Sequence, residues 1–178
     1  MTTADISHAD GVWTVLVAAG SGQRFGADKL EAYLDDERTV LDVALGQALA
    51  ASEGVVLVVR DDGRLAAPPP GVTAVAGGSS RSESVRRGLR AVPDTAQVVL
   101  VHDAARPLAD GPLFRRVIAA VRAGASAVVP AIPVVDTIRS LDGSAVARDQ
   151  LRAVQTPQGF DPGALRAAHA GEGEATDD

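Results

Sequence analysis

Two patterns of apolar residues alternate along the chain. In the first pattern, Val, Leu and Ala follow one another almost without interruption over a few positions. Such short continuous runs, rich in β-branched residues, are typical of strands that are buried on both faces of a sheet. They predict five strands, at residues 12–18, 55–59, 72–76, 98–101 and 125–129.

In the second pattern, apolar residues recur every three or four positions, as they do on one face of a helix. This pattern predicts helices at residues 39–52, 80–89, 110–122 and 161–170. Thr39 is the expected N-cap of the first helix and Gly54 its stop, and either Ser80 or Ser82 caps the second. Alternating strands and helices favour an α/β fold, a doubly wound and mostly parallel sheet with helices on both faces.

The pattern changes after Pro133. Two β-rich segments, at 134–139 and 145–148, flank a Leu-Asp-Gly-Ser turn, and they predict a protruding β-hairpin. We therefore treat residues 1–178 as a single domain with 134–153 as a protruding arm. Residues 155–160 are predicted to form a turn, and 171–178 are an acidic tail.

Composition narrows the possible classes of protein. The chain has 178 residues, 46% hydrophobic and 22% charged, which is typical of a globular domain. No apolar stretch approaches the roughly 18 residues of a membrane-spanning helix. We expect the first apolar run to be a strand and not a signal peptide, because acidic residues precede it. A net charge of −6 argues against non-specific binding to nucleic acid or an anionic membrane. The chain has no cysteine, which excludes disulfides and thiolate chemistry and fits a cytoplasmic location.

The loop after the first strand is a candidate phosphate-binding site. Residues 18–29 read A-A-G-S-G-Q-R-F-G-A-D-K, so glycines are followed by Arg24 and Lys29. Glycine lets backbone N–H groups approach phosphate oxygens, and the two cations add charge-assisted hydrogen bonds. The glycine spacing differs from the dinucleotide fingerprint and from the Walker loop, and a purely structural turn is the alternative. Lys and Arg together number 17, of which only Lys29 is lysine, leaving 16 arginines. A single lysine in such a loop is a candidate for a site that needs a compact ammonium group.

Two further loops follow predicted strands. The G-G-S-S-R-S-E-S-V segment at 77–85 opens a helix and is either an anion or base-edge site or an ordinary capped start. In V-H-D-A-A-R-P at 101–107, Asp103 ends a buried strand, where a carboxylate either holds Mg²⁺ on substrate phosphates or caps the next turn. His102 is interpreted as a packed neighbour and not as a base.

Several motifs occur in the order found in one family. They are the glycine-rich loop, G-G-x-x-R-x-x-S-V, V-H-D-A-A-R-P, P-V-V-D-T-I-R and T-P-Q-G-F. Together, over residues 12–178, they strongly resemble the 2-C-methyl-D-erythritol 4-phosphate cytidylyltransferases, and most of all the actinobacterial members. The resemblance implies a Rossmann-like nucleotidyltransferase fold and a homodimer formed through the hairpin arm. It implies magnesium-dependent transfer of CMP from CTP to the sugar-alcohol phosphate in the non-mevalonate isoprenoid pathway. The products would be 4-diphosphocytidyl-2-C-methyl-D-erythritol and pyrophosphate.

The resemblance also implies roles for individual residues. Backbone contacts to cytidine and triphosphate would come from Ala18, Ala19, Gly20 and Gly22. Contacts to cytosine and ribose would come from Gly78, Ser79 and Ser84. Asp103 would meet Mg²⁺ and the ribose, and Ala104 the nucleotide. Arg24 and Lys29 would stabilise charge on the α-phosphate. The acceptor would be positioned by Arg106, Asp136, Thr137 and Arg148, with Thr137 and the catalytic Arg148 reaching in from the partner subunit.

The acceptor phosphate is already an anionic nucleophile, so this chemistry needs no general base, only positioning and charge neutralisation. Two departures from the family pattern are visible. Asp28 stands where the family usually has proline, and the family continues for several dozen residues beyond Asp178, through a lysine that contacts the acceptor. The chain is therefore expected to be C-terminally short. Three alternative hypotheses stay open beside the methylerythritol phosphate cytidylyltransferase. They are a ribitol-5-phosphate cytidylyltransferase, a sugar-1-phosphate nucleotidyltransferase that uses another base, and a non-catalytic nucleotide-binding dimer.

Overall fold

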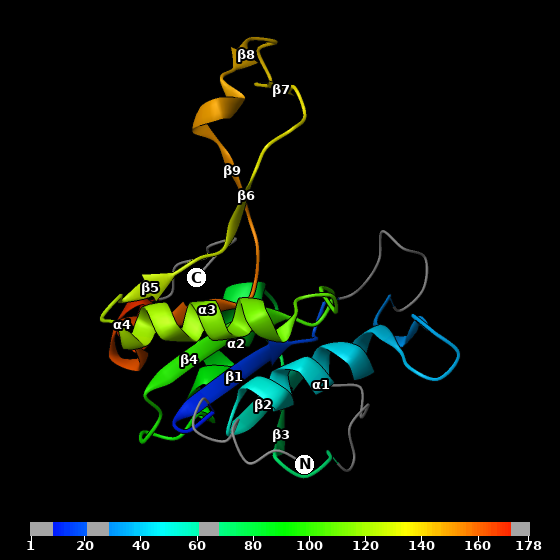
Figure 1. The fold of residues 1–178 in the computed structure, drawn as a ribbon, viewed down its shortest axis with the longest axis vertical. Helices are drawn as coiled ribbons and strands as arrows, with labels where there is room; N and C mark the ends of the chain where they lie inside the picture. Colours follow the sequence, from blue (N-terminus) through cyan, green and yellow to red (C-terminus); the bar gives the residue numbers. More distant parts are fainter. Residues whose placement is uncertain (1–8, 21–28, 61–67, 172–178) are drawn as a thin grey trace.

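The computed structural model describes residues 9–20, 29–60 and 68–171. Their centre is a six-stranded sheet in the order β3-β2-β1-β4-β10-β5 (Figure 1). These strands are β1 (Val12–Val17), β2 (Gly54–Val59), β3 (Val72–Ala76), β4 (Val98–Asp103), β5 (Ala127–Val128) and β10 (Gln158–Phe160). The first four strands pair in parallel, and β10 is antiparallel to both β4 and β5. The expectation of a mostly parallel α/β sheet is confirmed.

Among the described residues, four α-helices cover the sheet, namely α1 (Val40–Ala51), α2 (Arg81–Arg90), α3 (Gly111–Arg122) and α4 (Pro162–Ala168). Alternate strand residues point to opposite faces. On one face Val15, Val58 and their neighbours pack with α2 and α4. On the other face Leu16, Leu57 and Leu100 pack under α1 and α3. The doubly wound arrangement follows from this division of the apolar residues.

The predicted N-caps of the first two helices are confirmed, whereas the residue predicted to end the first helix is wrong. Thr39 caps α1 in a capping box with Asp42, and Ser80, not Ser82, caps α2. The prediction that Gly54 stops α1 is wrong, because the helix ends at Ala51 and Gly54 opens β2. Glycine is needed there for packing, since a Cβ at Gly54 would lie 2.5 Å from the ring of Trp13.

The predicted turn at 155–160 is wrong in its second half. Gln158–Phe160 form β10, which lies between β4 and β5. Only three residues pair, and they contain a glycine, so neither alternation nor an apolar run marks them as a strand. Gly159 lets α3 approach, because a Cβ there would lie 2.5 Å from Val117 Cγ1. The strand predicted at 125–129 is reduced to β5 at the edge of the sheet.

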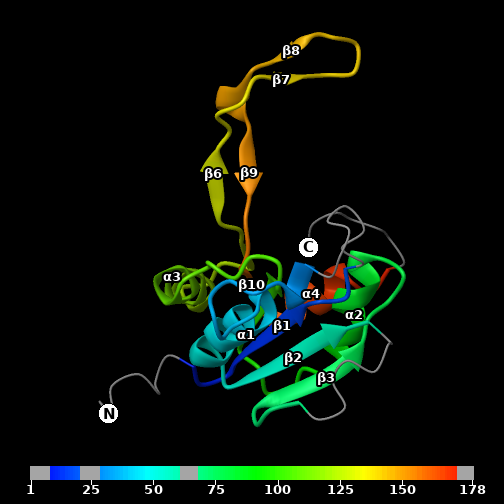
Figure 2. The same cartoon turned by 90° about the vertical axis from the view of Figure 1, so that its right-hand side faces the viewer.

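The hairpin arm stands well away from the sheet (Figures 1 and 2). It consists of two antiparallel ladders, one of β6 (Ala131–Pro133) with β9 (Arg152–Val154) and one of β7 (Ile138–Arg139) with β8 (Ala145–Val146). A short 3-10 helix, η4 (Arg148–Gln150), lies between β8 and β9. The ladders extend from Ala131 to Val154, slightly beyond the predicted range of 134–153.

Candidate nucleotide-binding site

A cavity of about 1050 Å³ opens at the carboxyl ends of β1 and β4. From β1 the chain proceeds to β2 and β3 on one side, while β4 lies on the other side of β1. Ligands of open α/β sheets bind at this reversal of strand order. The lining residues are Val17, Ala18, Ala19, Gly20, Lys29, Leu30, Arg60, Gly77, Gly78, Ser79, Ser80, Arg81, Ser84, Asp103, Ala105 and Arg106.

Most of the residues predicted for the nucleotide site meet in this cavity. The residues predicted for the nucleotide that line it are Ala18, Ala19, Gly20, Lys29, Gly78, Ser79, Ser84 and Asp103. Arg106, which was predicted for the acceptor, lines it too. Ala104 does not, because it is fully buried and its N–H donates to the carbonyl of Val17; the next residue, Ala105, lines the cavity instead. The predictions for Gly22 and Arg24 lie outside the described residues.

Lys29 reaches the cavity because the residue after it is anchored. Lys29 begins the short 3-10 helix η3 (Lys29–Glu31), in which Leu30 is buried in the core beneath α1. The Lys29 side chain is exposed. This anchoring places the chain's single lysine beside the ends of β1 and β4, where a triphosphate would need positive charge.

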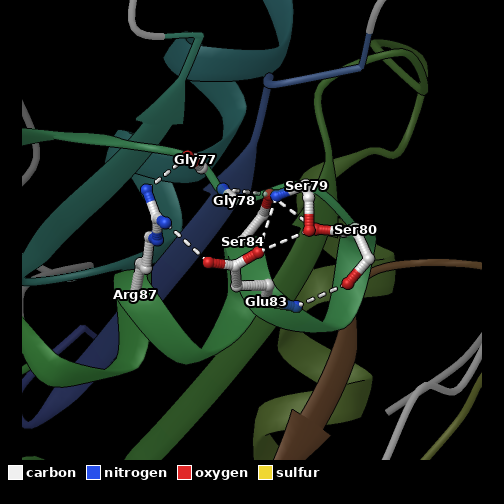
Figure 3. Close-up of polar contacts among 7 residues, drawn as sticks. All are labelled: Gly77, Gly78, Ser79, Ser80, Glu83, Ser84 and Arg87. Atoms are coloured by element: carbon white, nitrogen blue, oxygen red, sulfur yellow. Dashed lines mark hydrogen bonds and ion pairs between the residues drawn. The ribbon is translucent and has the colours of Figure 1, made fainter.

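The turn at 77–80 is built by side chains of α2 (Figure 3). The Ser84 hydroxyl accepts from Gly78 N at 3.0 Å and donates to the Ser80 carbonyl at 2.9 Å. Glu83 Oε2 accepts from both the amide and the hydroxyl of Ser79, each at 2.7 Å. These bonds use the hydroxyl protons of Ser79 and Ser84 inside the turn. Both serines therefore build the turn that would face a base, in addition to the contacts predicted for them.

Arg87 completes this turn. It donates to the Gly77 carbonyl at 2.7 Å and to Glu83 Oε1 at 2.5 Å. The hydroxyl and amide of Ser79, followed by Arg87, lower the pKa of Glu83 to about 2. Glu83 is therefore ionised at neutral pH and holds both the turn and the helix that follows. Sequence reasoning missed Glu83 and Arg87, although their i, i+4 spacing on a helix is a recognised signal for an ion pair.

Asp103, the last residue of β4, carries the carboxylate of the site. Its Oδ1 accepts from Arg81 Nε and Nη2, each at 3.3 Å, and its Oδ2 lies 3.6 Å from Arg106 Nε. About 29% of the Asp103 side chain is exposed, so a ligand in the cavity has access to it. Arg81 was quoted in the G-G-x-x-R motif but given no role, and the structure places it beside the predicted metal ligand.

The residues present fit a magnesium ion that is held chiefly by its substrate. Among the described residues no group of three or more His, Asp or Glu side chains gathers around one point. Mg²⁺ commonly takes only one or two carboxylates, with water and phosphate oxygens as its other ligands. A single accessible carboxylate in a cavity of this size suits that pattern, provided that Arg81 shares Oδ1.

The interpretation of His102 as a packed neighbour is confirmed. Its side chain is fully buried, with Nδ1 2.8 Å from Thr156 Oγ1 and the ring edge-on to Phe114 at 5.2 Å. Burial is the main cause that lowers the pKa of His102 to about 4, and Arg106 adds to it. The ring is therefore neutral at pH 7 and has no access to the cavity.

Three residues predicted to position the acceptor lie elsewhere. Asp136, Thr137 and Arg148 belong to the arm, and none of them lines the cavity of the same chain. Arg148 is exposed and donates to the Val135 carbonyl at 2.6 Å, within the arm. Of the predicted acceptor residues, only Arg106 is at the nucleotide cavity.

Fold and site together define a nucleotide-binding α/β protein, with glycine-rich turns, a lysine and a carboxylate gathered where the strand order reverses. Comparison with known families is more specific. The family model of 2-C-methyl-D-erythritol 4-phosphate cytidylyltransferase matches residues 12–178, and the chain belongs to this family. Within the described ranges, no helix is long and apolar enough to cross a bilayer.

Individual relatives agree with this assignment. The chain is 45% identical to the enzyme of that name from Rhodococcus opacus, over 94% of this chain and 79% of the relative. It is 42% identical to the enzyme of that name from Nocardia farcinica, over 98% and 81%. Among solved structures, the Thermus thermophilus cytidylyltransferase has 35% identity and a TM-score of 0.76, with 92% and 79% of the two chains covered. The Anaerococcus prevotii 4-diphosphocytidyl-2C-methyl-D-erythritol synthase has 29% identity and a TM-score of 0.78, with 94% and 81% covered.

Proposed function

We propose that this chain transfers CMP from CTP to 2-C-methyl-D-erythritol 4-phosphate and releases pyrophosphate, a step of non-mevalonate isoprenoid biosynthesis. Family membership supports the reaction. The observation that carries the proposal is the convergence of three loops, distant in sequence, on one cavity at the strand-order reversal. Since CTP is a cytoplasmic metabolite, the proposal includes a cytoplasmic location.

The cavity supplies what such a transfer needs. The acceptor is a phosphate monoester whose oxygen attacks the α-phosphate directly, so no side chain has to remove a proton. Lys29, and Arg24 in the same loop, would stabilise the charge that builds on the α-phosphate. Gly20 and Gly78 would let main-chain groups approach the nucleotide. Asp103 would hold Mg²⁺, which when bound supplies charge neutralisation and orients the triphosphate.

We also propose that the enzyme works as a homodimer through its arm. The arm presents exposed apolar side chains, among them Ile132, Val135 and Val154. At its root is a second, largely apolar cavity of about 440 Å³, lined by residues of α3, by residues 128–132 and by Gln155. An exchanged arm would cover these surfaces and would bring Asp136, Thr137 and Arg148 to the partner's acceptor site. This arrangement would account for the distance of those residues from their own chain's cavity.

A pyrophosphate-release assay tests the reaction. The chain is incubated with Mg²⁺, CTP and either 2-C-methyl-D-erythritol 4-phosphate or ribitol 5-phosphate, and other nucleoside triphosphates replace CTP in parallel. The proposal is supported if pyrophosphate is released only when CTP and 2-C-methyl-D-erythritol 4-phosphate are both present, and not with the other nucleotides or with ribitol 5-phosphate. Preference for ribitol 5-phosphate assigns the chain to the related enzyme. CTP binding without release, measured by calorimetry, indicates a non-catalytic binding dimer. Sedimentation equilibrium tests the dimer separately.

A further inference from the structure

Behind the nucleotide cavity lie two buried polar residues that the proposed reaction does not use. His102 is fully buried, and Thr156 is 4% exposed. Neither lines the cavity. Burying a polar group is costly unless it is hydrogen-bonded, so the hydrogen bonds of these two side chains are the first place to look for their role.

Thr156 lies where the β4–β10 ladder would continue. The last paired residues of that ladder are Val101 and Gln158. Two positions further along the same register, Thr156 faces Asp103. There the Asp103 amide donates to Thr156 Oγ1 at 3.2 Å. At Asp103, which carries the carboxylate of the site, the main chain is thus held by the hydroxyl of the Thr156 side chain.

The donor pattern at Thr156 is determined by its neighbours. Its hydroxyl has one proton and two lone pairs. One lone pair accepts the Asp103 amide, and the only other polar neighbour given for the hydroxyl in the described residues is His102 Nδ1 at 2.8 Å. Donation from Thr156 to Nδ1 uses the hydroxyl proton and the Nδ1 lone pair, whereas the opposite direction would leave the hydroxyl proton without an acceptor. His102 is then the tautomer with its proton on Nε2, in a ring packed edge-on against Phe114. Nε2 is buried and has no hydrogen-bond partner among the described residues, so the imidazole is satisfied only at Nδ1.

The same short segment holds the other end of the loop. Gln155, the residue before Thr156, accepts a hydrogen bond from Arg106 at its Oε1. Gln155 and Thr156 directly follow β9, the strand that returns from the arm. Two consecutive residues at the root of the arm therefore hold both ends of the segment from Asp103 to Arg106, and both of those end residues line the cavity.

We propose that Thr156, backed by His102, is a positioning residue that fixes the Asp103 main chain and, with Gln155, couples the root of the arm to the nucleotide cavity. The role rests on the proposed function, since Asp103 matters there as the ligand of the nucleotide-bound cation. A movement of the arm root would shift Asp103 relative to the nucleotide. Small displacements of a positioned group have large effects on turnover.

The test uses a valine isostere and a matched control. Thr156→Val removes the buried hydroxyl, and Thr156→Ser keeps it. Thr14→Val is the control, because Thr14 is also fully buried in the sheet and its hydroxyl bonds only the Ser52 hydroxyl, at 2.6 Å, among the partners given for it. Each variant is measured for the KM of CTP, for kcat, and by NMR for amide hydrogen exchange at Asp103. The amide of Ala104, which donates to the Val17 carbonyl, is the internal reference.

We expect Thr156→Val to reduce kcat/KM for CTP about tenfold and to speed exchange of the Asp103 amide by a similar factor, as expected when a buried N–H loses its acceptor. The Ala104 amide should be unchanged, Thr156→Ser should restore both values, and Thr14→Val should alter neither. Equal effects of the two valine variants on kcat/KM, or unchanged exchange at Asp103, would overturn the proposal.

Two further measurements keep the test decisive. If Thr156→Val does not fold, His102→Asn and His102→Leu replace it, because asparagine offers an acceptor near the position of Nδ1 and leucine does not. Faster exchange at Asp103 in the leucine variant alone supports the positioning role, and equal exchange in the two overturns it. If the wild-type chain releases no pyrophosphate, the proposed function fails, while the exchange comparison still decides the role of Thr156.

Discussion

Replacing Gly77 with alanine should impair nucleotide binding without unfolding the protein. A Cβ at Gly77 would lie 2.4 Å from the Cβ of Ala19, where ordinary contact begins at 3.4 Å. The shortfall is therefore about 1 Å. Neither atom belongs to a flexible side chain, so the main chain of the turn or of the loop after β1 must move by that amount. Both segments line the cavity.

A displacement of about 1 Å at a positioned site reduces turnover by up to about 10²-fold, and we expect a loss of that order in kcat/KM for CTP. Pyrophosphate release with Mg²⁺ and the methylerythritol acceptor measures it. The control is Gly46→Ala in α1, where a Cβ meets nothing within 4 Å, and which should retain full activity. Ala19→Gly combined with Gly77→Ala removes the close contact and should recover part of the loss. Recovery stays partial, because the new Cβ would still lie 3.1 Å from Ser84 Oγ. Near wild-type kinetics for Gly77→Ala, or no recovery in the double variant, would refute the reasoning.

Three other predictions concern the charged groups. Lys29→Ala should lower kcat by about 10²–10³-fold, and by more than it weakens CTP binding, because the interaction strengthens in the transition state. Lys29→Arg should restore little of the lost turnover, and full activity of either variant contradicts this prediction. In denaturation experiments, the wild-type chain should be more stable than Glu83→Gln, and this difference should be fully present above pH 4.5 and lost as the pH falls towards 2, because folding lowers the pKa of Glu83. A difference in stability that does not depend on pH would show that the carboxylate charge is not involved. Mixing inactive Lys29→Ala and Arg148→Ala subunits should restore part of the activity if the arm is exchanged, and heterodimers without recovery would place both residues in one site.

The sequence predicts the parallel half of the sheet well, for a physical reason. Strands β1, β2 and β4 are buried on both faces along most of their length, so each contains a nearly continuous apolar run. The sequence also predicts the helix starts well, because each begins at a residue type that commonly caps helices. Thr39, Ser80 and Asp110 accept hydrogen bonds from amides in the first turns that follow them.

The antiparallel half of the sheet is harder to predict from the sequence, because no local pattern of apolar and polar residues marks its strands. Strand β10 is three residues long and owes its place to pairing with β4, far away in the chain. Gln158 of this strand is buried, although glutamine is a residue type that is usually found at the surface. The same limit applies to the site. Lys29 and Asp103 stand out by type and position, whereas the pairing of Asp103 with Arg81 and the bonds made by Thr156 depend on tertiary contacts across 22 and 53 positions.

Three of the cations that line the cavity, Arg81, Arg106 and Lys29, differ in how they are held. Arg81 offers two nitrogens to one carboxylate oxygen of Asp103, and Arg106 is held by both Asp103 and Gln155. A planar guanidinium with several partners keeps its orientation, which suits groups that set the position of a carboxylate. Lys29 has a rotatable ammonium on a flexible stem, which suits an oxygen whose charge and position change during attack. In a chain where arginine outnumbers lysine 16 to one, this difference gives a physical reason for lysine at that position.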